Sequence, residues 1–102
     1  MCIRDSYCVS KAGVWMLTKV LALELSRYGI RVNAIGPGLI DTPMIAAMVA
    51  DEESRQQTIR RVPLGRLGEP SAIASTALFL ATAASSYFSG QMLHPDGGMF
   101  TG

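Results

Sequence analysis

The sequence predicts an α/β protein that forms part of a doubly wound parallel sheet, and three observations lead to that fold class. Two segments have the apolar spacing typical of helices, and each leads into a short apolar run typical of a strand. The order along the chain is helix, strand, loop, helix, strand. Because a strand, a crossover helix and a second strand are joined right-handed in such sheets, we expect the two strands to be parallel.

The first predicted helix covers residues 9–27. The segment is rich in Ala, Leu, Met, Lys and Glu, which favour helices. Its apolar residues recur every three to four positions, at Val14, Leu17, Leu21 and Leu25. Gly29 lies just past the predicted end, where a left-handed C-cap residue costs glycine little.

The first predicted strand covers residues 30–35. Ile30, Val32 and Ala34 alternate with residues that would lie on the other face. The sequence Gly36-Pro37-Gly38 then stops the strand. Ligands of open α/β sheets bind beyond the carboxyl ends of the strands, so this turn is expected at the ligand-binding edge.

The stretch from residue 41 to residue 67 is less regular. Residues 45–49 could form a short apolar helix, and residues 51–61 are highly charged. Pro63, Gly65 and Gly68 interrupt the chain that follows. A stretch this long in a compact domain is often a functional loop, and we interpret it as one.

The second predicted helix begins at Pro70, a residue well suited to a first helical turn. It runs through apolar residues to Ala81 and ends before Ser85-Ser86. Residues 91–94 are a short predicted strand, and the turn Asp96-Gly97-Gly98 closes it.

Composition limits the classes of function. Lys and Arg number 9 against 8 for Asp and Glu, and these charges are scattered, so neither nucleic acid nor a membrane is an expected partner. The apolar runs fall far short of the ~20 residues that a spanning helix needs, and no signal peptide is visible. Cys2, Cys8 and His94 have no metal-ligand spacing. We therefore expect a soluble cytoplasmic protein without a metal site.

The first six residues, Met-Cys-Ile-Arg-Asp-Ser, abut a helix start with no strand or loop leading into it. They match the translated end of a transposon adaptor, so we interpret residues 1–6 as a non-native N-terminal artefact. Two parallel strands do not make a stable sheet, since parallel sheets need more neighbours and cover on both faces. Residues 7–102 are accordingly interpreted as the C-terminal part of a single domain.

Tyr7 and Lys11 are the residues best placed for chemistry. They are four positions apart at the start of the first helix, so their side chains project from one face. A free tyrosine has a pKa of about 10, and a nearby ammonium favours the phenolate; lowering that pKa by about 3 corresponds to about 4 kcal/mol. Such a phenol could exchange a proton with a substrate hydroxyl. The pair alone is also common on exposed helix faces.

Several further motifs accompany this pair in a fixed order. Tyr7 to Gly13 reads YCVSKAG and resembles the YxxxK segment of short-chain dehydrogenases/reductases. The other matching segments are IRVNAIGPG at residues 30–38, IDTPM at 40–44, PLGRLGEP at 63–70, FSGQ at 88–91 and DGG at 96–98. The resemblance covers essentially everything from Tyr7 onward, and it implies a Rossmann-type fold and an NAD(P)-dependent oxidoreductase.

The resemblance implies a role for each matching residue. Tyr7 would be the acid in reduction and the base in oxidation, while Lys11 would lower its pKa and hydrogen-bond the nicotinamide ribose. The nicotinamide end of NAD or NADP would be lined by Pro37, Gly38, Ile40 and Thr42, with Ile40 and Thr42 near the carboxamide.

The segment from Gly36 to Asp41 is not a GxGxxG dinucleotide fingerprint. Pro37 has no amide hydrogen for a phosphate, and Asp41 stands where the third glycine should be. A pyrophosphate loop, the catalytic serine, its upstream asparagine and the residue that selects NAD or NADP would all precede Tyr7 in this family.

Other features leave alternatives open. Residues 44–49 resemble part of the family's substrate lid, or equally a short amphipathic surface helix. His94 is interpreted as structural rather than catalytic, and Cys8 as a buried small residue. The family resemblance implies a carbonyl or secondary alcohol as substrate and a homodimer or homotetramer. The alternatives are a non-catalytic or oligomerisation fragment and, with less support, an epimerase or lyase.

Overall fold

The computed structural model describes the backbone of residues 3–99 and the side chains of residues 9–99. Helices and strands follow the predicted α/β order, with additional short helices between them. The elements are α1 (Ile3–Leu25), the 3-10 helix η1 (Ser26–Tyr28), β1 (Ala34–Ile35), α2 (Pro43–Met48), α3 (Glu52–Arg60), α4 (Pro70–Ala81), the 3-10 helix η2 (Ala83–Ser85) and β2 (Met92–Leu93).

The two strands pair in parallel, as the sequence predicts. Ala34 lies opposite Met92 and Ile35 opposite Leu93. Each strand is shorter than predicted because side chains replace part of the backbone ladder. The amide nitrogen of Asn33 donates to the Phe88 carbonyl at 3.0 Å, and its amide oxygen accepts from the Gln91 N–H at 3.1 Å.

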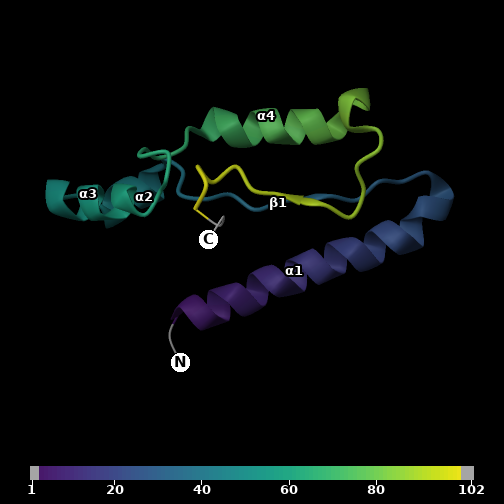
Figure 1. Ribbon diagram of the computed structural model, residues 1–102, viewed down its shortest axis with the longest axis horizontal. Helices are drawn as coiled ribbons and strands as arrows, with labels where there is room; N and C mark the ends of the chain where they lie inside the picture. The colour runs from purple at the N-terminus through teal and green to yellow at the C-terminus, as the bar shows by residue number, and fades with distance from the viewer. Residues whose placement is uncertain (1–2, 100–102) are drawn as a thin grey trace.

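The helices lie in layers around this pair. In Figure 1, α1 and α4 lie on opposite sides of the strands, and both helices contact β1. The N-terminal end of α1, together with α2 and α3, lies toward the end where β1 finishes (Figure 1). The carboxyl ends of the strands therefore face the start of α1, where Lys11 is located.

Helix α1 begins earlier than predicted. It starts at Ile3 rather than near residue 9, so residues 3–6 continue the helix instead of standing outside it. These residues include neither Gly nor Pro, so nothing in them ends a helix that the following segment favours. The C-terminal end agrees with the prediction, because Gly29 is left-handed with φ 72°.

The stretch expected to be a loop contains two short helices. Thr42 caps α2, and Asp51 caps α3 by accepting from the Ser54 N–H at 2.9 Å. Glu52 and Glu53 in the first turn and Arg60 in the last turn of α3 complement the helix dipole. The charged residues of this stretch, which we expected in a loop, thus occupy the cap and the two ends of a surface helix.

Helix α4 begins at Pro70 and ends at Ala81, as predicted. Arg31, which precedes β1 in the chain, forms hydrogen bonds to the C-terminal end of α4 and to the residues that follow it. The Arg31 guanidinium donates to the Leu80 carbonyl at 3.0 Å, the Ser85 carbonyl at 2.8 Å and the Phe88 carbonyl at 3.1 Å. Carbonyls left over at the helix end are satisfied in this way.

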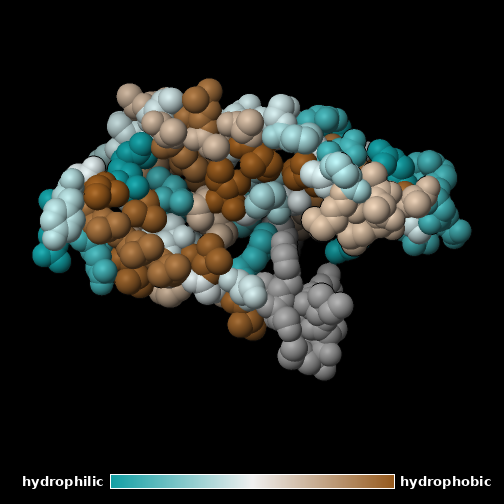
Figure 2. Space-filling view, turned by 180° about the vertical axis from the view of Figure 1, so that it is seen from behind, coloured by the Kyte–Doolittle hydropathy of each residue, from teal (hydrophilic) through white to brown (hydrophobic). Residues whose placement is uncertain are grey.

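Much apolar surface stays uncovered. Trp15, Met16, Leu17, Val20 and Leu23 of α1 are all exposed, and Figure 2 shows apolar side chains gathered along this helix. The buried apolar residues of the described part are few, namely Ala22, Ile40, Val49, Val62 and Leu67. No helix within residues 3–99 is both long and apolar enough to cross a membrane.

Candidate active site

The turn at residues 36–38 lies at the carboxyl end of β1, as predicted. The Gly36 N–H donates to the Leu93 carbonyl at 2.8 Å, and the Gly38 N–H donates to the Pro95 carbonyl at 3.3 Å. A Cβ added to Gly38 would lie 2.6 Å from the Cα of Asp96. The backbone leaving β1 is therefore held against the backbone leaving β2.

Ile40 forms a parallel bridge with Gly68. The Gly68 N–H donates to the Leu39 carbonyl at 2.9 Å, and the Asp41 N–H donates to the Gly68 carbonyl at 2.8 Å. Because neighbouring residues of an extended chain alternate in direction, the N–H and C=O of Ile40 itself point to the side away from Gly68. The Ile40 side chain is buried and packs on Gly68. The Ile40 side chain therefore covers Gly68, while its backbone N–H and C=O face the other side of the chain.

Lys11 reaches the same edge of the sheet from α1. Its Nζ atom is shielded from solvent and lies 3.5 Å from the point where a Cβ of Gly36 would be. His94, one residue after β2, approaches that point with its Cδ2 atom at 2.8 Å and its Nε2 atom at 3.1 Å. Lys11, Gly36 and His94 thus meet at the carboxyl end of β1.

Tyr7 precedes Lys11 by one helical turn within α1, which puts the two residues on one face of the helix. The side chains of Tyr7 and Cys8 lie outside the described residues. The expected pairing of phenol and ammonium stays a prediction for that reason.

Pro37 and Thr42 flank the same segment. Pro37 is exposed, and the Thr42 Oγ1 accepts from the Ile45 N–H at 3.4 Å at the start of α2. A hydroxyl has one donor hydrogen besides its acceptor lone pairs, so this bond leaves the donor hydrogen available. Thr42 can cap α2 and contact a ligand at the same time.

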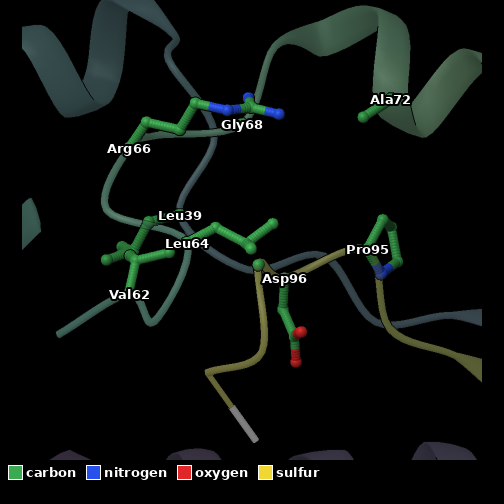
Figure 3. Close-up of a pocket in the computed structure, with 9 residues that line it drawn as sticks. Leu39, Val62, Leu64, Arg66, Gly68, Ala72, Pro95 and Asp96 are labelled. Atoms are coloured by element: carbon green, nitrogen blue, oxygen red, sulfur yellow. The ribbon is translucent and has the colours of Figure 1, made fainter.

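A cavity of about 210 Å³ lies beside this segment. In Figure 3, Leu39, Val62 and Leu64 gather on one side, Arg66 extends past Gly68, and the Asp96 carboxylate points away from Arg66. The lining includes none of the predicted site residues. This cavity is therefore separate from the place where Lys11 approaches Gly36. Within the described part of the chain, no group of His, Cys, Asp and Glu is arranged to hold a metal ion.

From the sequence we expect His94 to be structural, and no local pattern around it predicts that it lies near Lys11 and Gly36. One signal was available in principle. His94 and Gly36 each directly follow a strand, and residues that follow parallel strands meet at one edge of the sheet.

A family model described as enoyl-(acyl carrier protein) reductase matches residues 3–100. The chain belongs to the short-chain dehydrogenase/reductase family. The match extends over nearly the whole chain, so the resemblance first seen in separate motifs is confirmed.

Two curated relatives of this family are similar to the chain. It is 52% identical over 93 residues to 3beta-hydroxysteroid dehydrogenase 1 of Eggerthella lenta, a match that covers 91% of this chain and 36% of the relative. It is 47% identical over 96 residues to a 3-oxoacyl-[acyl-carrier-protein] reductase of Thermotoga maritima, covering 94% of this chain and 38% of the relative. The chain thus spans little more than a third of these relatives.

Solved structures confirm the Rossmann-type fold class. A protein of Agrobacterium tumefaciens described as a 2-deoxy-D-gluconate 3-dehydrogenase, solved with bound NADP, has a TM-score of 0.86 and 43% identity. That match covers 95% of this chain and 39% of the solved one. The fold of this chain therefore matches about two fifths of the solved chain.

Proposed function

We propose that the chain is the C-terminal part of an oxidoreductase that transfers a hydride between NAD or NADP and a carbonyl or secondary alcohol. One observation carries this proposal. The Lys11 Nζ atom is shielded from solvent at the carboxyl end of β1, beside Gly36, where ligands of such sheets bind. An ammonium one helical turn after Tyr7 at this edge is what the proposed chemistry needs.

The residues present fit a nicotinamide. A carboxamide has an acceptor oxygen and a donor NH₂ group, and the N–H and C=O of Ile40 offer the matching donor and acceptor on one side of the chain. Thr42 keeps a donor hydrogen nearby, and Gly38 and Pro37 would line the same segment. Lys11 would donate to the ribose. When bound, the nicotinamide supplies the hydride donor or acceptor.

The proposed proton transfer uses Tyr7 and Lys11. In reduction the Tyr7 hydroxyl donates a proton to the carbonyl oxygen of the substrate as the hydride arrives, and in oxidation the phenolate takes it back. The Lys11 ammonium favours the phenolate by its charge. Because the Lys11 Nζ atom is shielded from solvent, its field is weakened less by water than that of an exposed lysine would be.

The proposal also concerns the full-length parent protein, of which this chain would be the C-terminal part. Residues 7–102 would complete a domain whose glycine-rich loop, catalytic serine and asparagine precede Tyr7, and residues 1–6 would be non-native. The parent would be a cytoplasmic homodimer or homotetramer. The similarity to reductases of acyl carrier protein substrates and to sugar and steroid dehydrogenases supports a small carbonyl or alcohol substrate. A non-catalytic fragment is the alternative.

The upstream reading frame gives the first test. We expect it to encode a GxxxGxG segment and a serine about 13 residues before Tyr7, as the family pattern requires. Replacing Tyr7 with Phe in the full-length protein should lower kcat by about 100-fold or more, because general acid–base catalysis contributes on that scale. Cofactor affinity, measured by fluorescence titration, should stay nearly unchanged.

Tyr28→Phe is the matched control, since Tyr28 is exposed in the 3-10 helix η1, which follows α1. It should retain full activity. Equal activity of the Tyr7→Phe and Tyr28→Phe proteins would remove the proposed proton donor.

A further inference from the structure

We propose that the turn Asp96-Gly97-Gly98 is a positioning element that holds two segments of the site in one arrangement, a role that rests on the function proposed above. The first is the proposed cofactor-facing segment, residues 36–42. The second is the α2–α3 segment, residues 43–64, which would lie against the substrate because part of it resembles a substrate lid. The turn acts only through these two segments and is not catalytic in this proposal.

The α2–α3 segment is held at its ends rather than along its length. Across the described residues of α2 and α3, no side chain is buried. The residue after α2, Val49, and Val62, which follows α3 closely, are buried. The segment begins just after the bridge between Ile40 and Gly68. Because most of the stability of a helix in a protein comes from packing of one face, the chain at the two ends determines where this segment lies.

The turn contacts the C-terminal end of the α2–α3 segment. The Leu64 N–H donates to the Gly97 carbonyl at 3.1 Å. A Cβ added to Gly97 would lie 2.6 Å from the Val62 Cγ1 atom, and a Cβ added to Gly98 would lie 3.3 Å from the Pro63 side chain. Glycine at both positions therefore lets the backbone of the turn approach this end of the segment closely.

The same turn contacts the cofactor-facing segment. The Gly38 N–H donates to the Pro95 carbonyl at 3.3 Å, and a Cβ added to Gly38 would lie 2.6 Å from the Asp96 Cα atom. The turn is closed by its own hydrogen bonds, since buried Asp96 accepts through Oδ1 from the Gly98 N–H at 2.9 Å. Successive residues of one closed turn thus contact both segments, so a displacement of the turn should displace both.

Gly97→Ala in the full-length protein tests this role. Carbon atoms pack at about 3.5–4.0 Å, so the added methyl group should push Val62 away by about 1 Å. We expect kcat/KM to fall by about ten-fold or more, since a misplacement of about 1 Å can cost about 100-fold. Gly29→Ala is the matched control, because Gly29 is also left-handed, with φ 72° against 64°, and nothing lies within 4 Å of its Cβ position. It should stay within about two-fold of the parent, and an unchanged kcat/KM in Gly97→Ala would overturn the proposal.

A second substitution separates the contact from the backbone strain of alanine in a left-handed conformation. Val62→Ala removes the Cγ1 atom that the added methyl group would meet. The Gly97→Ala/Val62→Ala protein should therefore have a higher kcat/KM than Gly97→Ala. In the Gly29→Ala background, Val62→Ala should give no gain. No gain in the Gly97→Ala background would show that strain alone causes the loss, and it would overturn the proposal.

Hydrogen exchange in the full-length protein without cofactor measures the link independently of activity. In Gly97→Ala, the amides of Leu64 and Gly38 should both exchange faster, because their acceptors lie in the turn or directly before it. The Gly36 amide, which donates to β2, should keep its protection, whereas general destabilisation would speed exchange at all three. Val62→Ala loosens the same contact without straining the turn and should give the same pattern to a smaller degree. Faster exchange at Leu64 alone would show that the turn does not link the two segments and would overturn the proposal.

Failure of this proposal is separable from failure of the proposed function. Exchange at Leu64 and Gly38 does not depend on the Tyr7 hydroxyl, so it tests the turn even if Tyr7→Phe stays active. An inactive Tyr7→Phe protein beside unchanged exchange at both amides in Gly97→Ala would overturn only the positioning role.

Discussion

At the residue scale, Gly38 lies against the backbone that follows β2. A Cβ at this position would lie 2.6 Å from both the Cα and the Cβ of Asp96 and 3.2 Å from its carbonyl oxygen. The obstacle is backbone rather than the end of a flexible side chain, so it cannot move aside cheaply. The proposed cofactor-facing segment is thus placed by contact with the Asp96-Gly97-Gly98 turn.

Gly38→Ala is therefore expected to lower the free energy of unfolding of the full-length protein by about 1–3 kcal/mol, the usual cost of overpacking. Gly13→Ala is the matched control, because nothing lies within 4 Å of a Cβ at Gly13 in the interior of α1. That change should raise the free energy of unfolding by about 0.5–1 kcal/mol, since alanine favours helices more than glycine. Urea denaturation of both variants measures the difference, and an equal response would refute the packing argument.

His94 and Ile40 show what residue-level sequence reasoning could and could not find. From the sequence we expect Ile40 to face the cofactor, which stays a prediction; the structure shows that its side chain is buried on Gly68. The place of His94 beside Lys11 depends on the pairing of two strands that are far apart in the sequence. No local pattern contains that information.

At the element scale, helix boundaries were predictable where a single residue fixes them. Pro70 begins α4, and Gly29 ends the first helical segment through a left-handed conformation. Helix α3 was missed, although Asp51, the following glutamates and Arg60 form a recognisable capping and charge pattern. The highly polar composition of α3 hid that pattern, because a helix that buries so little has weak apolar periodicity.

The cap of α3 gives a pH-dependent prediction. The hydrogen bond from the Ser54 backbone N–H lowers the pKa of Asp51 below its ordinary value of 3.8. A carboxyl whose pKa is lower in the folded state stabilises that state above its unfolded pKa, and this contribution disappears as the pH falls through the folded pKa. The α3 cap should therefore weaken only when the pH falls below 3.8.

Asp51→Asn should keep the cap and abolish this pH dependence, whereas Asp51→Ala should lose both. Hydrogen exchange of the Ser54 amide, followed against pH in the full-length protein, measures the effect. Protection at Ser54 that is the same in Asp51→Ala and in the parent would contradict the capping role. Asp41→Ala, at an exposed position that does not cap a helix, is the control.

At the scale of the whole molecule, the chain is more open than a complete domain of its length. Its radius of gyration is 15.8 Å, whereas a compact domain of 100 residues has about 13 Å. Its accessible surface is 7224 Å², against about 5,600 Å² for a folded monomer of this mass. The exposed apolar side chains of α1 account for part of the excess.

From this openness we predict that the 102-residue chain by itself shows no measurable NAD(P)H turnover, while the full-length parent is active. The residues expected before Tyr7 would bind the pyrophosphate and polarise the substrate. In addition, the two paired strands of the described residues are too few to form a stable sheet. Turnover is measured by the absorbance of the reduced nicotinamide. A fluorescent dye that binds exposed apolar surface should bind the 102-residue chain more strongly than the full-length parent. Steady turnover by the chain alone would contradict this prediction.

The sequence by itself determined the fold class, the family, the order of the main elements and the residues expected to carry the chemistry. These depend on local patterns: helical spacing, a proline at a helix start, a glycine at a helix end, and motifs in a fixed order. Only the tertiary structure decided that Lys11, Gly36 and His94 meet and that the Ile40 side chain turns inward onto Gly68. The physical reason is that these contacts are set by strand register and helix packing between distant segments, which no short stretch of sequence specifies.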